Sequence, residues 1–285
     1  ITITPATPTV NVTGGTFVYD GNPHAATGFA YGVNGVGDVL SPAVTFSYTG
    51  AGGTVYGPSA IAPVDVGTYN VTASFAGNLN YVPANGTAVI TITQALATVS
   101  VTGGTFVFDG ASHGATGFAY GVGGVGDVLA PAVTFTYMGI GATTYGPTSV
   151  EPTNVGLYSV TALFAGNLNY ASAIGTTTIT ITQAAATVSV TGGTFVYDGI
   201  SHAATGFAYG VGGIADVQAP PVNFVYNGTG ATVYGPSPIA PVNVGTYDAT
   251  ATFFGNTNYA PASNTATITI TQAAATISAT GGSFV

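Results

Sequence analysis

The sequence repeats itself every 89 residues, and this repetition constrains the fold more than any other feature. The segment TGGTFVYD at residues 13–20 returns as TGGTFVFD at 102–109 and as TGGTFVYD at 191–198. His24, His113 and His202 keep the same spacing, so the repeats carry no insertions. We expect three copies of one folding unit.

The ends of the sequence match parts of further repeats. ITIT at residues 1–4 matches the end of a repeat, and TGGSFV at 280–285 matches the beginning of one. We therefore expect a window cut from a longer array. The predicted boundaries are the end of a preceding repeat at 1–4, repeats at 5–93, 94–182 and 183–271, and the start of a following repeat at 272–285.

Each repeat has the length and patterning of an immunoglobulin-like β-sandwich, which takes about 100 residues. Tyr69, Val71, Ala73 and Phe75 alternate with polar residues, as in a strand with one buried face. The fold class predicted is all-β, with tandem immunoglobulin-like sandwiches in a linear array. We expect six to eight strands per repeat, at about 9–19, 24–32, 43–49, 54–57, 67–76 and 87–94.

Turns and junctions complete this prediction. Asp20-Gly21, Asp109-Gly110 and Asp198-Gly199 are typical of hairpin turns. ITITQALATVSV at 90–101 carries one repeat into the next without a Gly/Ser or Pro linker, so neighbouring repeats should hold a restricted angle. Strands of ten to twelve residues give a domain about 35–40 Å long, and three in line a rod on the order of 100–120 Å.

Charge excludes several functions. The chain has no Lys or Arg, 9 acidic residues and a net charge of −9. Phosphate backbones and anionic lipids are bound through Lys and Arg, so nucleic acid and charged membrane surfaces are excluded as partners. Lysine isopeptide cross-links are excluded as well. No apolar run is long enough for a membrane-spanning helix, so we expect no membrane insertion.

The absence of cysteine excludes disulfides and thiolate chemistry. A surface this poor in charge has little repulsion to keep copies apart, which favours self-association. We therefore expect the partners to be further repeats in the same chain and other copies, by lateral or end-to-end contact.

A family resemblance rests on several segments in a fixed order. They are FVYDG, PHAAT, a glycine-rich stretch, APVDVGTYNVTASFAGNLNY and AVITITQA. This order resembles the bacterial MBG and YDG repeat domains across all three periods. The resemblance implies an immunoglobulin-like fold, an extracytoplasmic location and a structural or adhesive role, with no catalytic residues to carry over. The chain departs from the family in lacking lysine and in the added stretch near Asp38.

Histidine and aspartate recur at two places in each repeat. His24, His113 and His202 each follow an aspartate by four residues, and we interpret them as turn residues rather than as bases or metal ligands. Asp20, Asp109 and Asp198 should bond amides of their own turns, with calcium binding as the alternative.

The remaining acids are scattered. Asp38, Asp127 and Asp216 lie in the glycine-rich stretch, and the third acid moves between Asp65, Glu151 and Asp248. Calcium needs closely spaced carboxylates, and glycoside hydrolysis needs a facing pair. We therefore predict no catalytic, cofactor-binding or metal-binding residues, and no enzymatic activity.

Three further features keep two interpretations each. Gln94, Gln183 and Gln272 are either polar residues at the repeat junction or partners in a Thr–Gln ester. Recurrent aromatics, including Phe17, Phe29, Tyr31, Tyr56 and Tyr81, form either core and cross-strand pairs or a platform for surface glycans. Glycosylation sequons occur at positions that do not recur, namely Asn11, Asn70, Asn85 and Asn227.

The function predicted is structural. The chain should be part of a long extracellular or cell-surface stalk or filament of a microbial cell. The alternatives are an adhesin whose repeats bind glycan or protein, and a filament of subunits joined by strand donation through 1–4 or 280–285.

Overall fold

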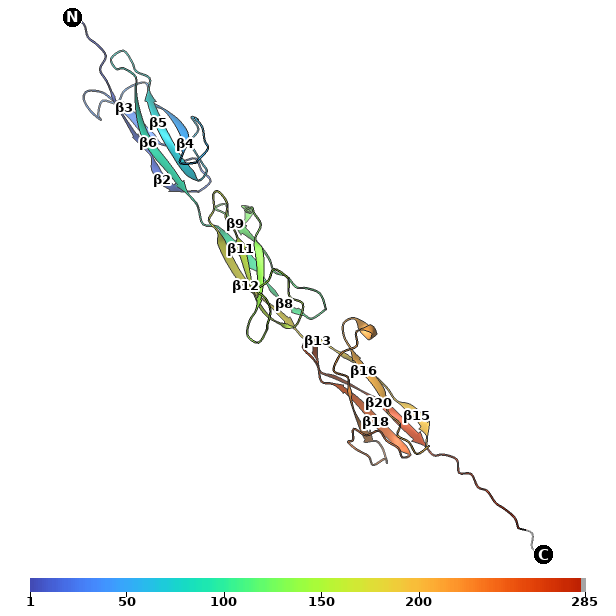
Figure 1. Cartoon of the computed structure of the whole chain (residues 1–285). Helices are drawn as coiled ribbons and strands as arrows, with labels where there is room; N and C mark the ends of the chain where they lie inside the picture. The colour runs from blue at the N-terminus through green and yellow to red at the C-terminus, as the bar shows by residue number, and fades with distance from the viewer. Residues whose placement is uncertain (283–285) are drawn as a thin grey trace. The chain divides into compact units, whose positions relative to one another are not determined.

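The computed structural model describes residues 1–282 (Figure 1). Its internal contacts divide the chain into two compact units. The first unit holds residues 1–102, 115–136 and 160–177, and the second holds 103–114, 137–159 and the rest of the chain from 178. Each unit thus contains one whole repeat and part of the middle one. The predicted domain boundaries stay a prediction. Of the predicted start of a following repeat, residues 283–285 lie outside the described part.

The first repeat is a two-layer β structure. β1 pairs with β3 in an antiparallel ribbon, and a four-stranded sheet has the order β2-β6-β5-β4. Valines of β1 pack on the buried Ala73 and Phe75 of the sheet, which closes the sandwich. The strands are β1 Thr9–Thr13, β2 Gly15–Val18, β3 Thr27–Tyr31, β4 Thr45–Ala51, β5 Gly67–Phe75 and β6 Ala84–Thr93.

The alternating pattern of β5 has the predicted result. Tyr69, Val71, Ala73 and Phe75 are all buried, and Ile90 and Ile92 of β6 lie beside them in the core. The chain is all-β, and its repeats are immunoglobulin-like sandwiches.

The predicted strand 9–19 is wrong in one respect, because it is two strands in different sheets. β1 pairs with β3, whereas β2 runs parallel to β6 with Gly15 opposite Ile90. The chain changes sheets at Gly14, where a Cβ atom would lie 1.9 Å from the Val89 carbonyl oxygen. Only glycine permits this approach between backbones.

Two further predictions need correction. Residues 54–57 form no strand, because glycines 52 and 53 adopt positive φ and turn the chain back, leaving Tyr56 to accept a single bond from the Gly50 N–H. The Asp20-Gly21 turn is not a hairpin, because the flanking strands β2 and β3 belong to different sheets.

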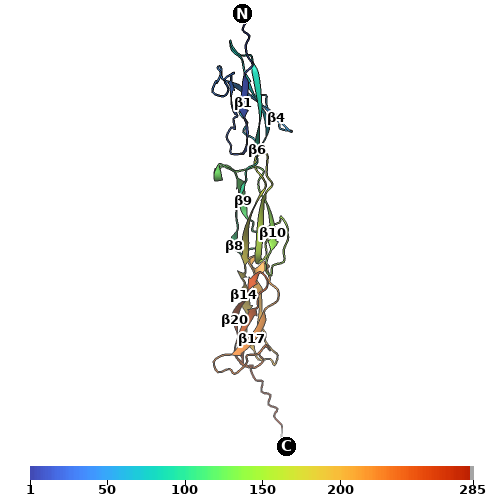
Figure 2. The same ribbon diagram turned by 90° about the vertical axis from the view of Figure 1, so that its left-hand side faces the viewer.

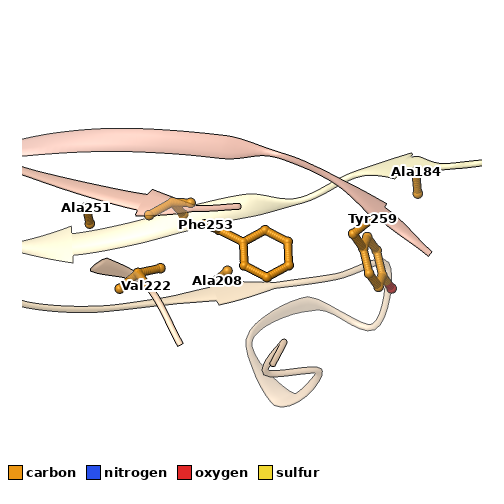
Figure 3. Close-up of a cluster of buried hydrophobic side chains, with 7 residues drawn as sticks. Ala184, Ala208, Val222, Ala251, Phe253 and Tyr259 are labelled. Carbon is orange, nitrogen blue, oxygen red and sulfur yellow. The ribbon is translucent and has the colours of Figure 1, made fainter. Parts of the chain in front are cut away.

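The third repeat, in the second unit, has the same construction. β14 pairs with β16, and the main sheet has the order β15-β20-β18-β17. Figure 2 labels β14, β17 and β20 of this repeat. Figure 3 shows the Phe253 ring of β18 inside the core, facing Ala208 with Tyr259 beside it. The elements are β14 Thr187–Thr191, β15 Gly193–Val196, β16 Thr205–Tyr209, η2 Gly213–Ala215, β17 Asn223–Gly228, β18 Gly245–Phe253, β19 Tyr259–Ala260 and β20 Ala262–Thr271.

The middle repeat repeats these elements at the same spacing. In the first unit β7 pairs with β9, and in the second unit β8 runs parallel to β12. None of the helices in residues 1–282 has the length and apolar character needed to cross a membrane. The elements are β7 Thr98–Thr102, β8 Gly104–Val107, β9 Thr116–Tyr120, η1 Gly124–Gly126, β10 Thr134–Gly139, β11 Gly156–Phe164, β12 Ala173–Thr182 and β13 Ala184–Ala185, which opens the third repeat.

Candidate functional site

The recurrent histidines lie in the turn after the second strand of each repeat. His24 stacks on Phe17 with ring centroids 4.3 Å apart, and its Nε2 lies 3.2 Å from Asp20 Oδ1. The other two repeats show the same stack, and there His113 and His202 Nε2 lie 3.1 Å from the turn carboxylate. All three histidines thus contact the aspartate of their own turn, and that they are neither bases nor metal ligands stays a prediction.

The turn aspartates bond their own turns as predicted. Asp20 Oδ1 accepts the backbone N–H of Asn22 at 2.8 Å, and Asp109 and Asp198 accept the equivalent N–H at 2.8 and 3.0 Å. This backbone bond is the main cause that lowers the pKa of all three carboxyls, and the histidine adds to the effect. Each of these carboxylates thus stabilises its own turn.

The second set of aspartates binds a tyrosine hydroxyl. Tyr81, Tyr170 and Tyr259 donate to Asp38, Asp127 and Asp216 at 3.2, 3.0 and 2.9 Å. Burial raises the pKa of Tyr170 and Tyr259, and the neighbouring carboxylate raises it further. Within residues 1–282, no three His, Asp or Glu side chains gather in a way that could hold a metal ion.

The recurrent aromatics contact one another and the core. The ring centroids of Phe29 and Tyr31 lie 6.0 Å apart, and Tyr56 packs edge-on against the buried Tyr69. The Tyr56 hydroxyl also donates to the Ile61 carbonyl. Tyr56 thus packs against the core, whereas Phe29 and Tyr31 are neighbours along β3 and do not form a cross-strand pair. A platform for glycans stays a prediction. The four sequons lie on strands, Asn11 on β1, Asn70 on β5, Asn85 on β6 and Asn227 on β17.

A five-residue loop, Gly-Asn-x-Asn-Tyr, organises one end of each repeat. We call it the Asn-Tyr loop; it spans residues 77–81, 166–170 and 255–259. In the middle copy Asn167 Oδ1 accepts the N–H groups of Asn169 and Tyr170, both at 3.0 Å, and its Nδ2 donates to the Ala130 carbonyl. These bonds fix the loop and leave the Asn169 side chain pointing outward.

Within the first unit, this loop of the middle repeat holds the first repeat. Asn169 Oδ1 accepts the Val66 N–H at 3.0 Å, and its Nδ2 donates to Asp65 Oδ1 at 2.9 Å. Gln94 Nε2 donates to the Asn167 carbonyl at 2.7 Å. Asp65, the acid with no fixed counterpart in the sequence, is therefore a junction residue.

Within the second unit, the loop of the third repeat makes the same contacts. Asn258 Oδ1 accepts the Val155 N–H at 3.0 Å, and Nδ2 donates to Asn154 Oδ1 at 3.0 Å. Gln183 Nε2 donates to the Asn256 carbonyl at 2.7 Å. Asn154 replaces Asp65, which keeps the acceptor oxygen and removes the charge.

The backbone and an aromatic pair complete both junctions. The Ala95 N–H donates to the Asn169 carbonyl at 3.0 Å, and β13, which begins at Ala184, runs parallel to β19. Both alanines are buried. Tyr170 packs edge-on against Tyr19 at 5.3 Å, and Tyr259 packs on Phe108 at 5.4 Å in the same geometry.

Gln94 and Gln183 thus lie at the repeat junctions as polar residues, the first of their two interpretations. The bonds of Gln94 and Gln183 go to main-chain carbonyls, which differs from the approach to a threonine hydroxyl that an ester requires. Gln272 is exposed. Sequence reasoning missed the outward asparagine of the loop, although its recurrence as Asn80, Asn169 and Asn258 was a visible signal.

The remaining acids and the end segments have simpler surroundings. Glu151 accepts a bond from the Ser112 hydroxyl at 3.0 Å, and Asp248 lies 3.5 Å from the Thr267 hydroxyl. Residues 1–4 and 280–282 form no strand in the described chain, and residues 283–285 lie outside it. Strand donation therefore stays a prediction.

Comparison with models of known protein families gives no match, and comparison with curated proteins gives none either. Among solved structures, the chain is similar to mouse protocadherin-24 EC1-3, with a TM-score of 0.32 and 13% identity over 95% of this chain and 100% of that one. Drosophila N-cadherin EC1-4 gives 0.30 and 13% over 91% and 72%. The three N-terminal domains of the bacteriophage RB49 outer capsid protein Hoc give 0.26 and 14% over 94% and 99%. These scores are too low to support an argument about function.

Proposed function

We propose that the chain is a structural segment of an extracellular repeat protein, forming part of a stalk or filament on or outside a microbial cell. In this proposal the repeats perform no chemistry. Each buries its own core, and the junctions fix the angle from one repeat to the next. The resemblance to MBG and YDG repeats supports the extracytoplasmic location.

One observation carries the proposal, namely that two junctions 89 residues apart are built from the same contacts. Two hydrogen bonds between repeats recur in each: one from a valine N–H to the outward asparagine, and one from that asparagine to the side chain at position 65 or 154. The alanine and glutamine at the junction bond the same loop from within its own repeat. A chain that needed only a flexible tether would have no use for this repetition.

The free energy of these hydrogen bonds favours a closed junction. A hydrogen bond contributes about 0.5–1.5 kcal/mol net, so two contribute roughly 1–3 kcal/mol. About 2 kcal/mol, the middle of this range, holds a junction closed roughly thirty times more often than open. Domains joined by small interfaces normally move relative to one another. The free energy of these hydrogen bonds is therefore what distinguishes the proposed stiff spacer from a chain of independently moving domains.

Amide ¹⁵N relaxation of the whole chain tests the proposal. We expect amides in all three repeats to report slow, anisotropic tumbling of a single body. The double variant Asn169→Ala and Asn258→Ala should tumble faster in each repeat because its junctions open. Fast, independent tumbling of the repeats in the unaltered chain would refute the proposal.

A further inference from the structure

A surface hollow in the third repeat lies at the edge strand β17 of the main sheet and has a volume of about 520 Å³. Part of its lining is common to all three repeats, because Val222, Phe224 and Tyr226 recur as the same residue types at offsets of 89 and 178. These residues belong to the repeated framework, so the framework alone does not distinguish the third repeat.

The rim of the hollow is specific to the third repeat. Phe254 occupies a position that is alanine in both other repeats, and Val225 takes the place of a serine and a threonine. Pro238 replaces an alanine and a serine, and Asn223 replaces a threonine in both. The corresponding positions are 76, 47, 60 and 45 in the first repeat and 165, 136, 149 and 134 in the second. Three of the four changes make the rim more apolar.

The Phe254 ring is the exposed aromatic surface of this hollow. Phe254 is 64% exposed, whereas Tyr226 is 3% exposed and Phe224 is half-buried. Val225 and Pro238 are also exposed. Single exposed apolar residues are common on protein surfaces. Apolar residues that gather at one hollow beside polar groups are instead typical of ligand sites.

Hydrogen-bonding groups lie beside the ring. Asn223 is exposed, and within residues 1–282 its side-chain amide has no hydrogen-bond partner. The Tyr226 N–H donates to the Ser237 carbonyl at 2.8 Å across the free edge of β17. Backbone groups two residues apart on a strand point to the same side, so the Phe224 N–H and carbonyl face this edge as well. An amide side chain and a strand edge can therefore bond a polar ligand.

Charge and size restrict the class of ligand. The chain has no Lys or Arg to pair with an anion, and its net charge of −9 repels one. Among the described residues, those that line the hollow include no Asp or Glu to pair with a cation. A specific protein interface takes about 20–30 residues a side, far more than surround this hollow. A sugar ring fits instead, because it offers an apolar C–H face to an aromatic ring and hydroxyl groups to amides.

We propose that this hollow binds a neutral saccharide, with the sugar ring stacked on Phe254 and its hydroxyl groups bonded to Asn223 and the edge of β17. The third repeat then binds a ligand in addition to its structural role, and the first two repeats do not. The inference is independent of the stiffness of the junctions, because all residues of the site belong to one repeat.

Backbone amide NMR of the whole chain, titrated with methyl glycosides of glucose, galactose, mannose and N-acetylglucosamine, tests the proposal. We expect at least one glycoside to shift the amide signals of Asn223, Val225 and Phe254. The amides at the corresponding positions of the first two repeats should not shift, which gives an internal control.

Phe254→Ala installs the residue that the other repeats carry and removes the aromatic platform. It should weaken glycoside binding about tenfold or more. Val233→Ala removes a fully exposed apolar side chain outside the hollow and should leave binding unchanged.

Transfer of the rim to the first repeat gives a second readout. The transferred chain should show glycoside-dependent shifts in the first repeat as well as in the third. The substitutions are Thr45→Asn, Ser47→Val, Ala60→Pro and Ala76→Phe.

The proposal is overturned if no glycoside shifts these amides, if all three repeats respond equally, or if Phe254→Ala binds as tightly as the unaltered chain. A proline-rich peptide that shifts the same amides while the glycosides do not would assign the hollow to a peptide ligand, and would also overturn it. Circular dichroism of each variant shows that the fold is retained. Amide relaxation scores the proposed function separately, because stiff junctions are compatible with a hollow that binds no sugar.

Discussion

Asn258→Ala isolates the contribution of one junction side chain. The substitution removes the bond from the Val155 N–H to Oδ1 and the bond from Nδ2 to Asn154, both 3.0 Å long. At about 0.5–1.5 kcal/mol each, the two bonds predict a loss of about 1–3 kcal/mol. With a denaturant slope of about 1–3 kcal/mol/M, the urea midpoint of the affected transition should fall by roughly 1 M.

Asn80→Ala is the matched control, because Asn80 holds the same loop position without a side-chain partner among residues 1–282. We expect its effect to stay within about 0.5 kcal/mol. Urea unfolding followed by circular dichroism at matched concentration measures both. In a double-mutant cycle, Asn154→Ala with Asn258→Ala should cost less than the sum of the single changes, since the two side chains share a bond. Equal losses for Asn80→Ala and Asn258→Ala would show that the asparagine stabilises only its own loop, and the reasoning would fail.

Three other predictions concern the repeats themselves. Phe253→Ala should cost about 3–5 kcal/mol because its ring is fully buried, whereas Phe254→Ala, at 64% exposure, should change stability by less than about 0.5 kcal/mol in the same urea titration. Folding lowers the pKa of the turn carboxyls of Asp20, Asp109 and Asp198. Their contribution to stability is therefore present above the ordinary aspartate pKa of about 3.9 and is lost as pH falls through the lower folded value. Thermal unfolding from pH 6 to 2 should show this loss, and replacing all three aspartates by Asn should flatten it. Burial raises the pKa of Tyr170 and Tyr259, so their contribution to stability is present below about pH 10 and is lost above it. Absorbance at the phenolate band should show that these tyrosines ionise above pH 10, together with unfolding. Ionisation of every tyrosine at or below pH 10 would contradict the burial.

Local pattern was sufficient for much of the fold. Alternation in 67–75 reflects a single strand with one face in the core, and that face is buried as predicted. The turn role of Asp20 also follows from local chemistry, because its carboxylate bonds an N–H two residues away. Such features depend on neighbours in sequence, so one chain segment contains the necessary information.

Contacts between segments that are distant in the sequence were harder to predict. The division of 9–19 at Gly14 depends on the approach of Val89, and nothing near Gly14 in the sequence announces it. Likewise Asn169 and Asp65 are 104 positions apart in the sequence, and only docking of the loop brings them together. The repeat made the Asn-Tyr loop visible, but its partner required the tertiary structure.

Distance measurements between spin labels test the central claim, that like junctions hold like angles, most directly. Thr87, Thr176 and Thr265 occupy the same exposed position on β6, β12 and β20. Cysteines at 87 and 176 in one chain, and at 176 and 265 in another, report on the two junctions by pulsed electron–electron double resonance. Identical contacts predict two narrow distributions with the same mean distance. Broad distributions, or two clearly different means, would contradict the account.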